Sequence, residues 1–292
     1  MIDSFTPAFF RHLQQLKIRT RRAFLGSRQG GHVSLRRGHG LEFADFRLYS
    51  PGDDFRHIDW GIFARSERLY IKQFREEQDL NVIFLLDCSA SMSLPENDHK
   101  FELCQELSLA LSYVALSDGD TIRIASLGKE LSPRFANARS WKKVATFLKE
   151  QKPAGHINLP YEIGLSMQRQ KTPGKCFLIS DFYYPHEDIF QAVRLLLARN
   201  FEVVLFHVLG NSELELKLDF GNHLIVDSET GETVEVILDQ SSVKDYAYAL
   251  ADHIATIEKF AVKIGVPHIL ISSAEDVREV VLKRLPQLGL LK

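Results

Sequence analysis

The sequence predicts an α/β fold with helices on both faces of a doubly wound, mostly parallel β-sheet. Two observations favour this class. Two continuous apolar runs, Asn81–Asp87 and Cys176–Asp181, each end in a carboxylate, and uninterrupted apolar runs of this length are typical of buried parallel strands. After residue 80, strand-like and helix-like segments alternate at the spacing of βαβ units. With 292 residues, 45% of them hydrophobic, the chain can bury a large core.

The predicted strands are short runs rich in branched and aromatic residues. Those expected to be parallel are Asn81–Asp87, Thr121–Leu127, Cys176–Asp181, Phe201–Val208 and His268–Ile271. After the Gly128-Lys129 turn, Leu131–Phe135 is expected to return as a short antiparallel edge strand. His207 lies inside one of these apolar strands, and we therefore expect it to be structural.

The predicted helices carry apolar residues at three- and four-residue spacing. In Lys100–Ser117 this pattern includes Phe101, Leu107 and Leu111, and Asp98 is the expected N-cap. The other expected helices are Trp141–Glu150, Tyr161–Gln170, Asp188–Arg199, Val243–Ile264 and Ala274–Leu285.

One segment interrupts the alternation of strands and helices. Glu215–Leu238 alternates weakly between apolar and polar residues around Asp227–Gly231, which has the composition of a turn. We interpret it as a β-hairpin inserted at about residues 213–239 of an α/β domain that spans residues 79–292.

The first 78 residues differ from the remainder. Thr6–Arg22 has the pattern of an amphipathic helix with Pro7 at its first position, and Gly- and Arg-rich sequence follows. Pro51-Gly52 suits the centre of a type II turn. We therefore expect residues 1–78 to form a basic N-terminal helix and an extended segment that pack on the main domain. In that segment, the charged and aromatic string Asp53–Arg65 is expected to be held by charge-assisted pairs.

Charge and composition exclude several classes of protein. The net charge of −2 combines 14 Lys and Arg against 7 Asp and Glu in residues 1–75 with 22 against 31 in residues 76–292. No apolar run approaches the length of a membrane span, and no leader pattern opens the chain. Three cysteines are too few for a disulfide framework, so we expect a cytoplasmic protein. The basic stretch Lys17–Arg37 lacks interleaved aromatic residues, and we expect no nucleic-acid partner.

The candidate functional residues follow two of the predicted strands. Asp87, Ser89 and Ser91 form a D-x-S-x-S sequence after the first strand, and Asp181 ends another. Ligands of doubly wound sheets bind outside the carboxyl ends of the strands. If these two strands are neighbours, the carboxylates and hydroxyls converge on one point. Such an all-oxygen set suits Mg²⁺ or Mn²⁺.

These residues resemble two known groups of proteins. D-x-S-x-S with a strand-end Asp resembles the metal-ion-dependent adhesion site of von Willebrand factor A domains. From about residue 30 to its end, the chain also resembles the bacterial proteins grouped as domain of unknown function 58. The matching segments are Gly38–Phe43, Asp45–Trp60, Ala64-Arg65, Leu86–Met92, Ile179–Phe182 and Phe206–Leu209.

The resemblance implies a von Willebrand A-like fold with strand order 3-2-1-4-5-6. It also implies a non-enzymatic protein-interaction module that works with a MoxR-type AAA+ ATPase to remodel or activate other proteins. In such a site an open position of the metal ion accepts an acidic side chain from the partner. The adhesion site takes a Thr ligand from a later loop, where this chain has Ile157. The adjacent Asn158 is the candidate replacement ligand.

Three alternatives remain open. Asp87 could cap the helix that follows, with Ser89 and Ser91 bonding to loop amides. The chain could be a metal-free structural adaptor that binds through its basic N-terminal face. It could also be a Mg-dependent haloacid-dehalogenase-like phosphatase with Asp87 as the nucleophile. That chemistry needs a second acid two residues later, where this chain has Ser89.

Overall fold

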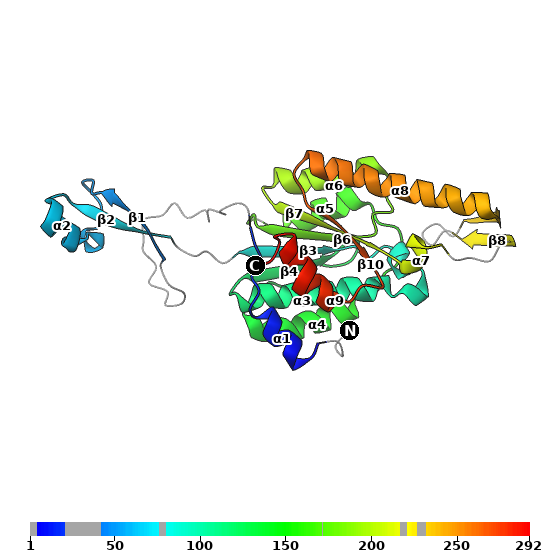
Figure 1. The fold of residues 1–292 in the computed structure, drawn as a ribbon, viewed down its shortest axis with the longest axis horizontal. Helices are drawn as coiled ribbons and strands as arrows, with labels where there is room; N and C mark the ends of the chain where they lie inside the picture. Colours follow the sequence, from blue (N-terminus) through cyan, green and yellow to red (C-terminus); the bar gives the residue numbers. More distant parts are fainter. Residues whose placement is uncertain (1–4, 21–41, 76–79, 171, 217–220, 227–231) are drawn as a thin grey trace. The chain divides into compact units, whose positions relative to one another are not determined.

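The computed structural model describes residues 5–20, 42–75, 80–170, 172–216, 221–226 and 232–292. The chain divides into two compact units (Figure 1). One comprises Met1–Phe24 with Leu80–Lys292, and the other comprises Leu25–Asp79. No helix within the described ranges is long and apolar enough to cross a membrane.

The larger unit is built on a six-stranded sheet in the order β10-β7-β6-β3-β4-β5. Neighbouring strands are parallel except at the β4–β5 pair, which is antiparallel. Numbered in chain order within this sheet, the strands run 3-2-1-4-5-6, as expected. Their bounds are β3 (Asn81–Leu86), β4 (Thr121–Ser126), β5 (Phe135–Ala136), β6 (Lys175–Ser180), β7 (Glu202–Leu209) and β10 (His268–Ser272).

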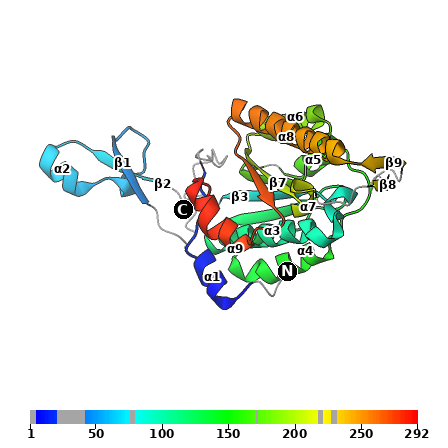
Figure 2. The same cartoon turned by 45° about the vertical axis from the view of Figure 1, so that its right-hand side comes forward.

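Helices cover both faces of this sheet, so the mostly parallel α/β architecture is confirmed (Figures 1 and 2). On one face α3 packs against α1, α4 and α9, and on the other α6 packs against α5 and α8. The helices are α1 (Pro7–Leu13), α3 (Lys100–Ser117), α4 (Trp141–Glu150), α5 (Leu159–Gln168), α6 (His186–Ala198), α7 (Asn211–Leu214), α8 (Gln240–Lys263), α9 (Val277–Glu279) and α10 (Leu285–Gln287). Short 3₁₀ turns lie at η2 (Ala90–Ser93), η3 (Glu96–Asp98) and η4 (Ala138–Ser140).

The core is centred on β3, all of whose residues are buried because strands flank it and helices cover it. Phe84, Phe177 and Phe206 stack across three adjacent strands, with ring centroids 5.3 and 5.6 Å apart. Such stacking adds to the stabilisation that comes from burying each ring. This packed centre holds the carboxyl ends of β3 and β6 in fixed positions beside each other.

The first helix is shorter than the predicted Thr6–Arg22. It ends at Leu13, and an extended segment then pairs with the end of the chain, where the Lys17 amide donates to the Lys292 carbonyl. Phe9 and Leu13 are buried in the core of the α/β unit. The smaller unit ends at Asp79, one residue after the expected boundary at 78/79, and Met1–Phe24 belong to the larger unit. Residues 21 and 22 of the expected helix lie outside the described residues.

The smaller unit contains an antiparallel pair, β1 (Glu42–Leu48) and β2 (Tyr70–Arg75). Between them lie η1 (Phe55–His57) and α2 (Trp60–Ser66). The Arg47 guanidinium makes two 2.6 Å hydrogen bonds to the Asp53 carboxylate, and Asp59 caps α2. These contacts agree with the structural role expected for the Asp53–Arg65 string.

The inserted hairpin is present as the antiparallel pair β8 (Gly221–Val226) and β9 (Thr233–Leu238). The predicted turn at Asp227–Gly231 lies outside the described residues. The expected Leu131–Phe135 strand is reduced to an isolated bridge and the two-residue β5. Pro133 explains the interruption, because its nitrogen cannot donate to a strand partner.

The last predicted helix, Ala274–Leu285, is also divided. It begins at α9, continues as a π-helical turn at η5 (Val280–Arg284) and ends in α10. Asp276 caps its start through the Arg278 amide, and Pro286 lies just after the π-helical turn. A proline removes one amide donor from a helix, which favours a change in hydrogen-bond pattern nearby.

Candidate functional site

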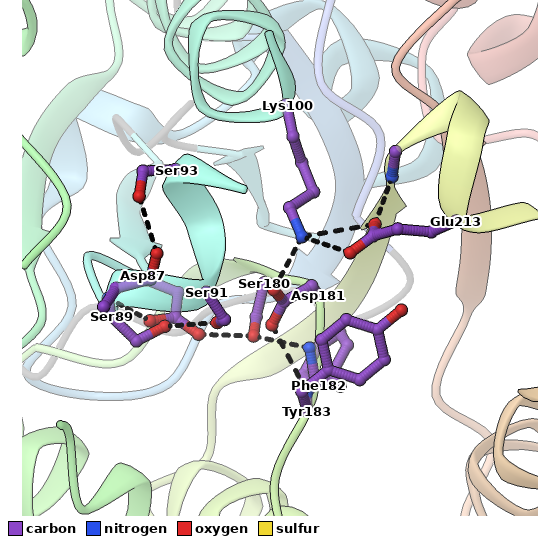
Figure 3. A network of polar contacts seen from close by, with 12 residues as sticks. Asp87, Ser89, Ser91, Ser93, Lys100, Ser180, Asp181, Phe182, Tyr183 and Glu213 are labelled. Atoms are coloured by element: carbon purple, nitrogen blue, oxygen red, sulfur yellow. Dashed lines mark hydrogen bonds and ion pairs between the residues drawn. The ribbon is translucent and has the colours of Figure 1, made fainter. Parts of the chain in front are cut away.

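The carboxyl ends of β3 and β6 lie side by side, as the sequence required for its candidate site. Leu86 pairs with Ile179 in the parallel ladder, and the Asp87 amide donates to the Ile179 carbonyl at 3.0 Å. The structure therefore brings Asp87 and Asp181 together at one edge of the sheet (Figure 3). Both carboxylates are completely buried.

Asp87 is saturated by hydrogen bonds from its own domain. Its carboxylate accepts from the Ser180 hydroxyl at 2.6 Å, from the Ser89 amide at 2.9 Å and from the Tyr184 hydroxyl at 3.0 Å. Burial, and then the nearby charge of Asp181, raise the pKa of Asp87 to about 6. Asp87 therefore links two loops, and its oxygens are already occupied.

The two serines of the D-x-S-x-S sequence lie beside Asp87. The hydroxyl oxygens of Ser89 and Ser91 are 3.0 Å apart and share a hydrogen bond. Ser89 is completely buried, whereas Ser91 is partly exposed. The four polar side chains of the predicted site thus lie at the carboxyl ends of β3 and β6 (Figure 3).

A buried lysine that the sequence analysis missed contacts the second carboxylate. Lys100 Nζ lies 2.9 Å from Asp181 Oδ2 and 3.0 Å from Glu213 Oε1 (Figure 3). Burial by itself lowers the pKa of Lys100, but Asp181 and Glu213 outweigh this and raise it above its ordinary value. Lys100 is therefore a charged ammonium group inside the protein.

The sequence carried one signal for Lys100. It occupies the same helical stripe as Cys104, Leu107 and Leu111, and a lysine on an apolar stripe indicates a buried ion pair. Its partner Glu213 lies on α7, 113 residues away, and no local pattern joins the two.

Asp98 does not have the role expected from the sequence, because its carboxylate contacts α7. Its carboxylate accepts from the amide and hydroxyl of Ser212, at 2.8 and 2.7 Å. The residue at the N-cap of α3 is His99, and its side chain makes no capping bond. The prediction that Asp98 caps this helix was wrong, because its carboxylate is used to hold α7.

Ile157 and Asn158 lie in the loop before α5. Ile157 is buried and packs closely against Gly128. A Cβ added to Gly128 would lie only 3.0 Å from Ile157 Cγ1. The Asn158 side-chain oxygen accepts from the Tyr161 amide at 3.0 Å and caps α5. The structure thus uses the Asn158 side-chain oxygen as a helix cap.

These residues do not fit the Mg²⁺ or Mn²⁺ site that the resemblance implies. The Asp87 oxygens accept from protein donors, and Asp181 Oδ2 accepts from an ammonium group. Of the four predicted ligands, Asp87, Ser89 and Asp181 are completely buried, and Ser91 is partly exposed. In the part of the chain that is described, no group of three or more His, Cys, Asp or Glu side chains could hold a metal ion.

A chain of histidines lies beneath the loop that follows Asp181. His253 Nε2 is 3.0 Å from the Phe182 carbonyl, and its Nδ1 is 3.0 Å from His186. His207 Nδ1 is 3.1 Å from His268 Nε2. Burial lowers the pKa of His207, His253 and His268. This chain supports Phe182, whose φ of +54° lies in the left-handed region.

The basic face proposed for the alternative adaptor is described only in part. Lys17 pairs with Asp118 at 2.6 Å on the larger unit. Arg19 also lies on the larger unit, where its amide donates to the Leu290 carbonyl at 2.9 Å. The other basic residues of that stretch lie outside the described residues, and these are Arg21, Arg22, Arg28, Arg36 and Arg37.

Two similar proteins are named as uncharacterized. Uncharacterized protein Rv1480 of Mycobacterium tuberculosis is 28% identical over 285 residues, which cover 92% of this chain and 86% of that protein. Uncharacterized protein YeaD of Bacillus subtilis is 29% identical over 100 residues, which cover 34% of this chain and 23% of that protein.

Two solved structures show partial similarity. BatB from Bacteroides thetaiotaomicron aligns with a TM-score of 0.41 at 12% identity, over 72% of this chain and 98% of its own. An aerotolerance-related membrane protein from Bacteroides fragilis aligns with a TM-score of 0.40 at 14% identity, over 71% and 97%.

The family assignment comes from the sequence. The family model described as "Protein of unknown function DUF58" matches residues 45–256, which include β3, the D-x-S-x-S sequence, Lys100, Asp181 and Glu213. This match covers well over half of the chain, and the chain therefore belongs to the DUF58 family.

Proposed function

We propose that this chain is a non-enzymatic protein-interaction module of the von Willebrand A type that works in the cytoplasm with a MoxR-type AAA+ ATPase. The partner follows from the resemblance of its motifs to proteins that accompany such ATPases. The binding surface is the carboxyl edge of the six-stranded sheet, where doubly wound folds bind their ligands.

The observation that carries this proposal is a set of exposed apolar side chains at that edge. They belong to the loop after β3, the first turns of α5 and the loop after β6, and are Leu94, Tyr161, Leu165 and Tyr183. Apolar side chains exposed at a ligand-binding edge are typical of protein contacts, in which tyrosines contribute strongly.

The loops that carry these side chains are fixed to each other. The Ala90 amide donates to the Gly155 carbonyl at 2.9 Å, and the Ala154 amide donates to the Cys88 carbonyl at 2.8 Å. A surface that is already ordered loses less entropy when a partner binds. This arrangement supports a docking surface at the carboxyl edge.

The burial of Asp87 supports a role without catalysis. A phosphatase nucleophile must reach a phosphorus atom, but this carboxylate is completely buried and accepts hydrogen bonds from Ser89, Ser180 and Tyr184. The position two residues later, where a general acid is needed, is Ser89.

The proposal is tested by measuring binding of the full chain to a purified MoxR-type ATPase from the same organism. Tyr161→Ser is expected to weaken binding about tenfold or more, because it removes an exposed aromatic side chain from the surface. Tyr248→Ser is the matched control, since Tyr248 is also exposed but lies on α8.

Three outcomes would contradict the proposal. Failure of the unmodified chain to bind the ATPase would exclude this partner. Equal loss of binding in both tyrosine variants would exclude the surface. Hydrolysis of p-nitrophenyl phosphate that disappears in Asp87→Asn would favour the phosphatase.

A further inference from the structure

We propose that Lys100 is a built-in cation that takes the electrostatic role of a divalent ion at this edge of the sheet, and that the site works without metal. The inference concerns the site itself and holds whichever partner the surface binds. It rests on the position, burial and contacts of the Lys100 ammonium group.

The ammonium group is placed between two carboxylates from separate elements. It lies 2.9 Å from Asp181, which follows β6, and 3.0 Å from Glu213 on α7. The Lys100 and Asp181 side chains have no exposed surface, and that of Glu213 is 13% exposed. A buried charge is tolerated only when it is paired, and here one ammonium group is the counter-charge of both carboxylates.

An aromatic ring also contacts the Lys100 ammonium group. Its Nζ lies 5.3 Å from the centroid of the Tyr183 ring, within the range of a cation–π contact. An ammonium has three N–H donors, and here it has two carboxylates and an aromatic face around it. Lys100 is therefore held in place and cannot turn away to leave room for an ion.

Asp87, the first carboxylate of the cluster, is stabilised by hydrogen bonds. It accepts from the Ser180 and Tyr184 hydroxyls and from the Ser89 amide, and no cation among the described residues pairs with it. Hydrogen bonds from the protein thus stabilise Asp87, while Lys100 stabilises Asp181. Between them these groups supply what a metal ion and its bound waters would otherwise supply.

The substitution of an ion by a lysine has a consequence that can be measured. If Lys100 is shortened, Asp181 and Glu213 lose their counter-charge and a space opens beside them. The carboxylate oxygens of Asp181 and Glu213 are then free of the ammonium group, and carboxylates are ligands that Mg²⁺ and Mn²⁺ prefer. We expect the shortened variant to acquire the metal affinity that the natural chain lacks.

The experiment uses the full chain after treatment with a chelator. In calorimetric titration the unmodified protein is expected to show no saturable binding of Mg²⁺ or Mn²⁺, and its melting temperature should not change with either ion. Lys100→Ala is expected to melt about 10 °C lower, because two buried carboxylates are left unpaired. Millimolar Mn²⁺ should restore part of this loss, and Lys100→Ala/Asp181→Asn should show no such recovery.

A second buried lysine provides the matched control. Lys175 is buried like Lys100 and pairs with Glu202, but it lies at the amino end of β6, away from the serines. Lys175→Ala is expected to lose stability without any recovery in Mn²⁺, because Lys175 Nζ donates to one carboxylate, Glu202, and to the Arg19 main-chain carbonyl.

Two results would overturn the inference. The first is saturable binding of Mg²⁺ or Mn²⁺ to the unmodified protein that is lost in Asp181→Asn. The second is a folded Lys100→Ala protein that binds neither ion. If Lys100→Ala does not fold, Lys100→Met is used, because it keeps the apolar part of the side chain. The titration of the unmodified protein still shows whether the site holds only the Lys100 ammonium group or also binds a divalent ion.

Discussion

The Ser180 hydroxyl donates a 2.6 Å hydrogen bond to Asp87 Oδ2 and so joins the ends of two neighbouring strands. Both side chains are completely buried. The same hydroxyl oxygen accepts from the Phe182 amide at 2.8 Å. One serine therefore fixes the carboxylate after β3 and the start of the loop after β6.

Ser180→Ala is expected to lower the free energy of unfolding by about 1–3 kcal/mol, because a buried carboxylate loses a donor. Ser112→Ala is the control, since the Ser112 hydroxyl is buried and has no hydrogen-bond partner among the described residues. Its removal should cost almost nothing in a urea titration. Equal losses in the two variants would show that Ser180 does not stabilise Asp87.

The raised pKa of Asp87 predicts a specific dependence of stability on pH. Its pKa is about 6 in the folded protein, against 3.8 ordinarily, so the folded chain binds a proton at higher pH than the unfolded chain. The contribution of this group to stability therefore increases as the pH falls through 6 and is complete near 4.

Asp87→Asn removes that titration. Between pH 7 and pH 4, the stability difference between the unmodified protein and the variant should change by about 3 kcal/mol in favour of the unmodified protein. Urea titrations at several pH values measure this difference. Parallel stability curves for the two proteins would contradict the raised pKa.

The buried histidines predict that stability falls, and does not rise, as the pH is lowered. Burial, followed by the nearby His268 and His253, lowers the pKa of His207 well below 6.5. The unfolded chain therefore binds a proton first as the pH falls below about 6.5, and the folded protein loses stability there. Other charged groups near the histidine chain are Lys100, Asp181, Asp252 and Glu258.

His207→Phe keeps a ring against Phe182, 5.3 Å away, but cannot bind a proton. Its stability should fall less steeply between pH 6.5 and 5 than that of the unmodified protein. Thermal melts across this range provide the measurement, and an unchanged slope in His207→Phe would contradict the prediction.

Two glycines are expected to respond differently to alanine. A Cβ on Gly174, just before β6, would lie 1.8 Å from the Asn81 carbonyl oxygen, whereas a Cβ on Gly164 in α5 would meet nothing within 4 Å. Gly174→Ala should therefore destabilise the fold by about 3 kcal/mol or more, because backbone must move. Gly164→Ala should stabilise it by about 0.5–1 kcal/mol. Similar melting temperatures for the two variants would show that β3 and β6 do not approach so closely.

Much of the fold could be predicted because its signals are local. The runs ending at Asp87 and Asp181 are apolar throughout because each strand is buried on both faces, and parallel strands bring their carboxyl ends to one edge. The α1 helix was overestimated because the polar face continues past Leu13, and the pairing of Lys17 with Lys292 that ends it spans the whole chain. Pro133 was a local signal for the shortened edge strand.

The sequence by itself determined the buried parallel strands and placed Asp87, Ser89, Ser91 and Asp181 directly after two of them. The strand order came from the family resemblance, and the structure shows that these two strands are neighbours. The tertiary structure alone decided which groups contact the two carboxylates, Asp87 and Asp181. Lys100 is 81 residues from Asp181 and 113 from Glu213, and Tyr184 is 97 from Asp87. Periodicity reports which face of an element is buried, but charge pairing depends on which elements pack together. That packing placed an ammonium group beside Asp181, where the local motif had suggested a metal ion.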